Sequence, residues 1–187
     1  MSFISKIILR LFGFKLRGEF PKVDKMVVIA APHTSAWDFI IGYLALKGFN
    51  LKPFFVIKKE YFFFPLKYIL RLLGGIPIDR GNIKNNFVEK MVEEFNKRKK
   101  FCLVITPEGT RKKTNRWKKG FYLIAQNANV PIVVTKLDYG NKLLGPVKTI
   151  LPSGNYFYDL QIIAECYKNV IGKNKDNFDL PKILIDE

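Results

Sequence analysis

The sequence FCLVIT, residues 101–106, is the clearest buried strand of the chain, and a second run, MVVIAA at residues 26–31, ends at Pro32. Short, continuous apolar runs of this kind are typical of strands buried on both faces of a sheet. Stretches with helical spacing alternate with further strand-like stretches around them. Helices are expected over residues 36–48, 65–73, 87–99, 117–129 and 160–171, and further strands over residues 53–57, 76–79, 132–139 and 148–151. This alternation predicts an α/β layered domain with a largely parallel central sheet flanked by helices.

The size and charge of the chain narrow the range of partners. Its 187 residues suit one domain with a substantial core. The 32 Lys and Arg residues outnumber the 16 Asp and Glu residues, giving a formal net charge of +16. Such a charge predicts anionic partners: nucleic acid, acidic lipid headgroups or phosphorylated substrates. The 17 Phe residues gather in apolar clusters instead of alternating with basic residues, so a membrane surface is favoured over nucleic acid.

The rarest residue types exclude several kinds of site. The chain has two Cys residues and no CxxC pair, which excludes a disulfide-rich scaffold and a zinc site built from cysteines. It has a single histidine, His33, so sites that need two histidines, such as the HExxH metalloprotease site, are excluded as well.

The first 14 residues, MSFISKIILRLFGF, carry apolar side chains at helical spacing, flanked by Lys6, Arg10 and Lys15. One interpretation is an amphipathic helix in the bilayer interface with its cations near lipid phosphates, and the other is a helix docked on the core. The cations interrupt the apolar stretch and argue against a signal peptide, and no apolar run is long enough for a spanning helix. We expect a membrane-associating amphipathic helix over residues 1–18 and a single α/β domain over residues 19–187.

A second apolar cluster, YFFFPLKYILRLL at residues 61–73, is more apolar than a surface helix requires. Lys58 and Lys59 precede it, and Lys67 and Arg71 lie within it. Apolar side chains beside long cationic ones suit a lipid interface. A place in the core and a second membrane-contacting face are equally compatible with this sequence.

His33 lies in the sequence PHTSAWD, residues 32–38, directly after the strand expected at residues 26–31. Open α/β sheets place their sites where strands end and helices begin. A histidine accepts protons well, and Asp38 can fix its tautomer and stabilise the imidazolium. Ser35 and Asp38 also fit a helix capping box, with Ser35 at the N-cap and Asp38 at N3, which would need no catalysis. Both interpretations can hold together because a carboxylate has two oxygens.

Two further loops contain an arginine that can clamp a phosphate, GGIPIDRG at residues 74–81 and PEGTR at residues 107–111. The arginines are Arg80 and Arg111, and the second loop adds the Thr110 hydroxyl and the backbone N–H groups near Gly109 as donors. A solvated or salt-bridged arginine is the alternative interpretation of each. Further cations after the second loop suit an anionic ligand: Lys112, Lys113, Arg116, Lys118 and Lys119.

These loops together resemble the glycerolipid acyltransferases of the 1-acylglycerol-3-phosphate (lysophosphatidate) acyltransferase type. The family's block of His, four residues and Asp matches His33 and Asp38, and its Gly-rich turn ending in Arg matches residues 74–80, with Pro77 where an aromatic residue is commoner. Its third block matches residues 108–111 without a departure, and its fourth, an apolar stretch with a central Pro, matches residues 130–133. Lys118 and Gly120 also fall where the family tends to carry a Lys and a Gly. The ordered conjunction of these blocks favours a catalytic role for His33.

The resemblance implies acyl transfer from acyl-CoA or an acyl carrier protein to the free hydroxyl of a lysophospholipid, with 1-acylglycerol 3-phosphate as the leading acceptor and phosphatidic acid as the product. His33 would be the general base and Asp38 would orient it. Arg80 and Arg111 would hold the phosphate of the acceptor. Glu108 and Gly109 would shape that pocket, with Thr110 and Lys118 also among the substrate-binding residues. No metal and no tightly bound cofactor are required.

The resemblance also implies a peripheral protein at the cytoplasmic face of a bacterial cell membrane, with an acidic acyl carrier protein as a further partner and no role for nucleic acid. Pro77 leaves another lysolipid, such as an amino-acid lipid, open as the acceptor. Two other classes compete with the transferase: a non-enzymatic module that binds anionic membranes, and a hydrolase of acyl thioesters or lipids that uses the same His–Asp pair on water.

Overall fold

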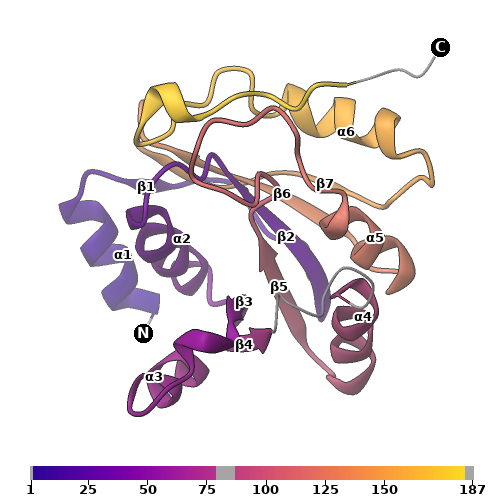
Figure 1. Ribbon diagram of the computed structural model, residues 1–187. Helices are drawn as coiled ribbons and strands as arrows, with labels where there is room; N and C mark the ends of the chain where they lie inside the picture. Colours follow the sequence, from indigo (N-terminus) through magenta and orange to yellow (C-terminus); the bar gives the residue numbers. More distant parts are fainter. Residues whose placement is uncertain (1, 79–86, 184–187) are drawn as a thin grey trace.

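The computed structural model describes residues 2–78 and 87–183, and the helices and strands within these ranges alternate along much of the chain (Figure 1). The strands are β1 (Lys15–Leu16), β2 (Lys25–Ala31), β3 (Pro53–Lys58), β4 (Gly75–Ile78), β5 (Phe101–Ile105), β6 (Ile132–Asp138) and β7 (Leu143–Ile150). The α-helices are α1 (Ser2–Leu11), α2 (Trp37–Gly48), α3 (Leu66–Leu72), α4 (Phe87–Lys97), α5 (Gly120–Asn127) and α6 (Tyr156–Glu165). Two short 3₁₀ helices, η1 (Lys59–Tyr61) and η2 (Lys175–Asn177), complete the described part.

All the strands within the described ranges form one seven-stranded sheet in the order β1-β7-β6-β2-β5-β3-β4. Every neighbouring pair is parallel except β6 and β7, which are antiparallel. The predicted α/β architecture with a largely parallel sheet is therefore confirmed, and so is a helix ahead of it. No helix of the described residues is both long and apolar enough to cross a membrane.

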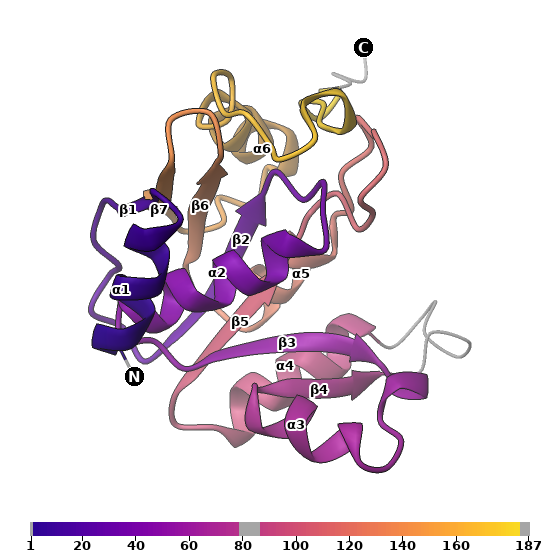
Figure 2. The same cartoon turned by 90° about the vertical axis from the view of Figure 1, so that its left-hand side faces the viewer.

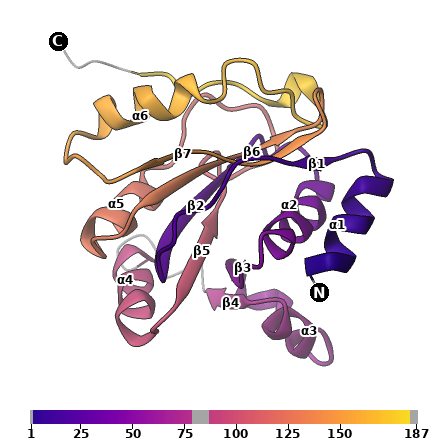
Figure 3. The ribbon, with the colours of Figure 1, turned by 180° about the vertical axis from the view of Figure 1, so that it is seen from behind.

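Helices cover both faces of the sheet, α1 and α2 on one side and α4, α5 and α6 on the other (Figures 1 and 3). The central strand β2 shows why its sequence is apolar at every position. Val27 and Ile29 pack into the core beneath α4, α5 and α6, whereas Met26 and Val28 pack into a separate cluster toward α2. A strand buried on both faces has no polar side to expose, as its sequence predicted.

Three elements differ from the expected boundaries by more than two residues. The helix expected at residues 117–129 begins only at Gly120, because Trp117 is a buried residue of the preceding loop. The helix expected at 160–171 is α6, which begins earlier because the Asn155 side chain accepts a hydrogen bond from the Tyr158 N–H. It also ends earlier, and Tyr167 and Val170 are buried in the segment that follows, so helical spacing persists beyond the helix. The strand expected at 148–151 is the longer β7.

The N-terminal helix α1 docks on α2 and still exposes its apolar stripe. Ser5 and Leu9 are its buried residues, and the Ser2 hydroxyl donates to the Gly48 carbonyl over 3.0 Å. The apolar side chains that face outward from this segment are Phe3, Ile4, Ile7, Leu11 and Phe12. The helix therefore packs against α2 with one face and leaves several apolar side chains of its other face in solvent.

Candidate active site

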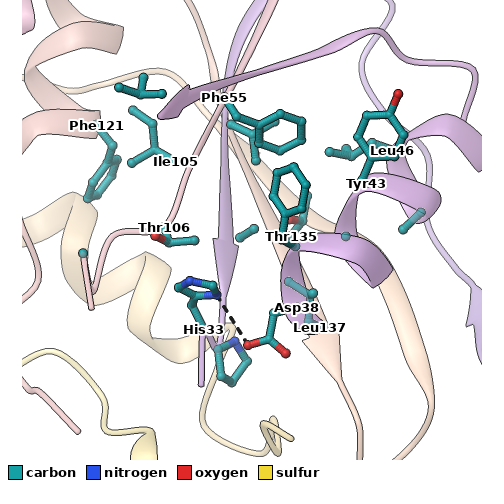
Figure 4. Close-up of a pocket in the computed structure, with 18 of the residues that line it drawn as sticks. His33, Asp38, Tyr43, Leu46, Phe55, Ile105, Thr106, Phe121, Thr135 and Leu137 are labelled. Atoms are coloured by element: carbon teal, nitrogen blue, oxygen red, sulfur yellow. Dashed lines mark ion pairs between the residues drawn. The ribbon is translucent and has the colours of Figure 1, made fainter. Parts of the chain in front are cut away.

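His33 and Asp38 lie where β2 gives way to α2, at the carboxyl end of a central strand (Figure 4). The Nδ1 atom of His33 is 3.4 Å from the Oδ2 atom of Asp38. Asp38 is buried, whereas the His33 side chain is 22% exposed. Since Nδ1 faces the carboxylate, Nε2 is the ring nitrogen left to meet a substrate. The pair that the sequence predicted is thus brought together in the fold.

Asp38 is fixed by hydrogen bonds from three directions. Its Oδ2 accepts from the backbone N–H groups of Thr34 and Ser35 at 2.6 and 2.7 Å, and its Oδ1 accepts from the Tyr139 hydroxyl at 2.8 Å. Burial acts to raise the pKa of Asp38, but the hydrogen bonds from His33, Tyr139 and the backbone outweigh it and hold the pKa below its usual value. Asp38 is therefore a carboxylate at neutral pH.

The helix-capping interpretation also holds in part. The Ser35 N–H donates to Asp38, and the Ser35 hydroxyl accepts from the Trp37 N–H at 3.3 Å, as in a reciprocal cap. However, α2 begins at Trp37 with Ala36 as its N-cap, one residue later than the capping box predicted. The carboxylate of Asp38 thus binds backbone N–H groups just before the start of α2 and contacts His33 at the same time.

Tyr139 was not identified from the sequence. It follows β6, which pairs in parallel with β2, so both strands deliver their last residues to the same edge of the sheet. Its backbone N–H donates to the Ile171 carbonyl at 2.8 Å, which anchors the residue beside the site. The apolar strand expected at 132–139 signalled its position, but the pairing of that strand with residues 26–31 was needed to place it next to Asp38.

Glu108 lies behind His33 in the loop after β5. It is buried, and its Oε1 accepts a hydrogen bond from the backbone N–H of His33 at 2.9 Å. Its Oε2 has no hydrogen-bonding partner among the described residues. Burial raises the pKa of Glu108 to about 7, although the bond from His33 acts in the opposite direction. Glu108 therefore connects the loop after β5 to the loop that carries the histidine.

The same loop brings several of the predicted substrate-binding residues to the histidine. Gly109, Thr110, Arg111 and Lys118 all line the pocket that His33 lines. Gly109 has a φ of +63°, and a Cβ there would lie 2.7 Å from the Cε of Lys118, so glycine allows the lysine side chain to lie across this turn. Arg80, the other predicted phosphate ligand, lies outside the described residues.

A pocket of about 880 Å³ extends from His33 and Asp38 between α2 and the sheet (Figure 4). Tyr43 and Leu46 of α2 form one wall, and Phe55, Thr135 and Leu137 of the strands contribute to the other. Most of its lining is apolar, and the cationic side chains that line it within the described ranges are Lys58, Arg111, Lys118 and Lys136. A cavity of this size and lining suits a ligand with a long apolar part and an anionic group.

These features define an α/β protein with a His–carboxylate pair beside a large apolar pocket. A solved structure with the same fold is the 1-acyl-sn-glycerophosphate (LPA) acyltransferase PlsC from Thermotoga maritima. It matches with a TM-score of 0.63 and 19% sequence identity, over 89% of this chain and 75% of that one. The chain belongs to the Acyltransferase family, whose model matches residues 14–135. The family expected from the four sequence blocks is therefore confirmed.

Two relatives share more of the sequence. The 1-acyl-sn-glycerol-3-phosphate acyltransferase of Streptococcus pneumoniae is 32% identical over 114 residues, which are 60% of this chain and 42% of that protein. The 1-acyl-sn-glycerol-3-phosphate acyltransferase of Cocos nucifera is 38% identical over 108 residues, 54% of this chain and 33% of that protein. The chain thus matches less than half of the length of either relative.

Proposed function

We propose that this protein transfers a fatty acyl group from an acyl thioester to the free hydroxyl of 1-acylglycerol 3-phosphate and so forms phosphatidic acid. The observation that carries the proposal is the His33–Asp38 pair beside the apolar pocket, in a chain of the Acyltransferase family. Two relatives with this named activity support the choice of acceptor. Acyl-CoA and an acyl carrier protein are the two donors to test.

In the proposed reaction, Nε2 of His33 removes the proton from the acceptor hydroxyl, and the oxygen attacks the thioester carbonyl carbon. The tetrahedral intermediate collapses as the C–S bond breaks. The imidazolium returns the proton to the departing sulfur, so that ester and free thiol are the products. The carboxylate of Asp38 keeps Nδ1 protonated and stabilises the positive charge on the ring. The bound alcohol is the nucleophile, so no acylated residue is needed.

The lining of the pocket supports separate places for the apolar and the anionic parts of the substrates. Its apolar part would hold an acyl chain, since burial of such a chain is favourable by about 0.8 kcal/mol per methylene group. Arg111 and Lys118 would attract the acceptor phosphate near His33, and Thr110 would add a hydroxyl donor. We keep Arg80 as a phosphate ligand on the strength of the sequence block alone.

We further propose that the protein works at an anionic membrane surface, at the cytoplasmic face of a bacterial cell membrane. The exposed stripe of α1, with Lys6 and Arg10 beside it, has the composition of a helix that lies in the lipid interface. A lysolipid acceptor and a lipid product both reside there. Only Ser5 and Leu9 of this helix are fully buried, which leaves its other apolar side chains available for this use.

The experiment that tests the proposal measures free-thiol release from a long-chain acyl-CoA, with and without 1-acylglycerol 3-phosphate, in the presence of lipid. We expect release that depends on the lysolipid and falls by about a thousandfold in His33→Ala. Asp38→Asn should also lose most of the activity. Asp176→Asn, the same change at an exposed carboxylate, should retain it.

The outcomes separate the competing classes. Release without an acceptor would mean a thioesterase, with water in place of the alcohol. If no thiol is released, an acyl carrier protein donor and other lysolipids, including amino-acid lipids, are tried next. Failure of all of these, with binding to anionic vesicles retained, would favour a membrane-binding module.

A further inference from the structure

The segment from η1 to the end of α3 presents an apolar surface that no described residue covers. No residue of α3 is buried. Phe64 is 76% exposed and Leu72 is 84% exposed, values at which an aromatic and an aliphatic side chain lie almost wholly in solvent. We call the exposed apolar side chains of this segment, other than Tyr61, the α3 face: Phe63, Phe64, Tyr68, Ile69 and Leu72. A contiguous patch of this kind on a basic protein points to an interaction surface.

Cations interleave with the α3 face. The segment and the two residues before it hold one acid, Glu60, and four cations: Lys58, Lys59, Lys67 and Arg71. The Nζ of Lys67 lies 5.0 Å from the centre of the Tyr68 ring, so a charge and an aromatic side chain share one place on the surface. Apolar side chains that can insert, beside cations on long stems, match the lipid–water interface of an anionic bilayer.

The α3 face has a definite position in the molecule. In all three ribbon views α3 lies next to β4 and far from α6 (Figures 1, 2 and 3). It is on the same side of the sheet as α1 and α2 (Figure 3). The segment also begins beside the pocket, because Tyr61 within it and Ile57 and Lys58 just before it line the pocket. A bilayer that contacted the α3 face would therefore meet the protein beside the pocket.

We infer that the α3 face is a second lipid-contacting surface, separate from α1, which lies against an anionic bilayer and brings the pocket to the lipid interface. The role in substrate access rests on the proposed function, whereas the lipid contact itself does not. Lipid is favoured over a second copy of the chain as the occupant, because a symmetric pairing would bring two like-charged faces together.

The test compares sedimentation of the full chain with vesicles of phosphatidylcholine alone and of phosphatidylcholine with phosphatidylglycerol. The double variant Phe64→Ser/Leu72→Ser should bind the anionic vesicles about tenfold more weakly, with the residual binding due to α1. Lys67→Gln/Arg71→Gln should reduce the preference for the anionic vesicles by a similar factor. The matched control is Leu151→Ser/Tyr158→Ser, which removes two exposed apolar side chains elsewhere and should change binding less than twofold.

A second measurement separates this inference from the proposed function. Acyl transfer to a short-chain lysolipid kept below its micelle concentration should be the same in Phe64→Ser/Leu72→Ser as in the parent chain, while transfer on vesicles falls. If the parent chain shows no transfer at all, the proposed function fails, but the binding comparison still decides the lipid contact. Unchanged vesicle binding by the variant would overturn the inference. Loss of a dimer in the variant, with vesicle binding intact, would identify a second copy as the occupant and overturn it as well.

Discussion

Asp38 makes more hydrogen bonds than a helix cap requires. Two backbone N–H groups and the Tyr139 hydroxyl donate to it before His33 is counted. These donors stabilise the carboxylate and leave it little freedom to turn, so the direction of His33 is set by a group that is itself fixed. Tyr139 is the only side-chain hydroxyl among the described residues that donates to Asp38, and it therefore makes a separable contribution.

Tyr139→Phe is expected to lower kcat/KM by about tenfold or more, since a hydrogen bond to a charged group contributes roughly 1.5–3 kcal/mol. Loss of this donor also raises the pKa of Asp38, because the bond from Tyr139 acts to lower it. The acid limb of the pH–rate profile should consequently move toward neutral pH. Tyr158→Phe, at an exposed tyrosine, is the control. An unshifted acid limb in Tyr139→Phe would show that Tyr139 does not act through Asp38.

Glu108→Gln should change how stability depends on pH. The folded state raises the pKa of Glu108 from 4.5 to about 7, so it binds more protons than the unfolded chain between these pH values. The free energy of unfolding therefore falls by up to about 3 kcal/mol as pH rises through this window, and the contribution is constant outside it. Glutamine does not titrate, so the stability of the variant relative to the parent should increase from pH 4.5 to pH 8.

Urea unfolding at several pH values measures this difference. The absolute stability of Glu108→Gln also depends on how its amide is accommodated at the unpartnered Oε2 position, but that contribution is the same at every pH. Glu93→Gln, at an exposed carboxylate on α4, serves as the comparison. A constant difference between Glu108→Gln and the parent across the pH range would contradict the buried, protonated carboxyl.

The sequence predicted those site residues whose partners lie close to them along the chain. His33 and Asp38 are five positions apart, and their spacing alone brings them onto one turn between a strand and a helix. Tyr139 is 101 positions from Asp38 and meets it only through the parallel pairing of β2 with β6, which apolar patterning does not specify. Glu108 was identified, but its bond to the His33 backbone depends on the adjacent pairing of β2 with β5.

At the scale of the elements, small residues of α2 and of the sheet contribute to the lining of the pocket and leave it room. Gly42 and Ala45 on α2, Ala30 on β2 and Gly145 on β7 all line it. A larger side chain at Gly42 would extend into this space, because the nearest described atom to its Cβ position is the Cδ2 of Leu137 at 3.5 Å. The small size of these side chains thus contributes to the volume of the pocket.

Gly42→Leu should therefore shorten the acyl chain that the protein accepts. A Cβ at Gly42 would lie 3.5 Å from the Cδ2 of Leu137, an ordinary contact, so Gly42→Ala fits and should gain about 0.5–1 kcal/mol of helix stability. The larger leucine would occupy the pocket itself. We expect transfer from a long-chain thioester to fall about tenfold relative to a short-chain one in Gly42→Leu only. Identical chain-length profiles in both variants would mean that the acyl chain lies elsewhere.

The elements that the sequence predicted best are the strands with a continuous apolar run, because burial on both faces leaves a strong pattern. The edge of the sheet was harder. In β7 the residues Gly145 and Pro146 interrupt the pattern, and a register shift between Val134 and Thr135 accommodates them, so only the second half of the strand was expected. The two-residue β1 is too short for any periodicity and was missed.

At the scale of the whole molecule, composition predicted the kind of partner but not where it would contact the protein. The sequence predicted a membrane-associating helix over residues 1–18 and left the 61–73 cluster equally compatible with core and lipid. The fold exposes apolar side chains of both, since α1 buries only Ser5 and Leu9 fully and α3, beside the edge strand β4, buries none. Whether a helix such as α3 is exposed depends on which strand lies at the edge of the sheet. Strand order decides this, and the local sequence does not predict strand order.

The net charge of +16 should make the reaction sensitive to salt. Screening shortens the range of these charges from about 30 Å at 0.01 M ionic strength to about 8 Å at 0.15 M. Attraction of anionic substrates then weakens, and kcat/KM for acyl-CoA with 1-acylglycerol 3-phosphate should fall about tenfold between about 0.02 M and 0.5 M NaCl. A small uncharged acyl thioester in place of acyl-CoA should show a smaller decrease. Equal salt dependence with both donors would indicate that the charges serve the acceptor or the membrane and do not guide the donor.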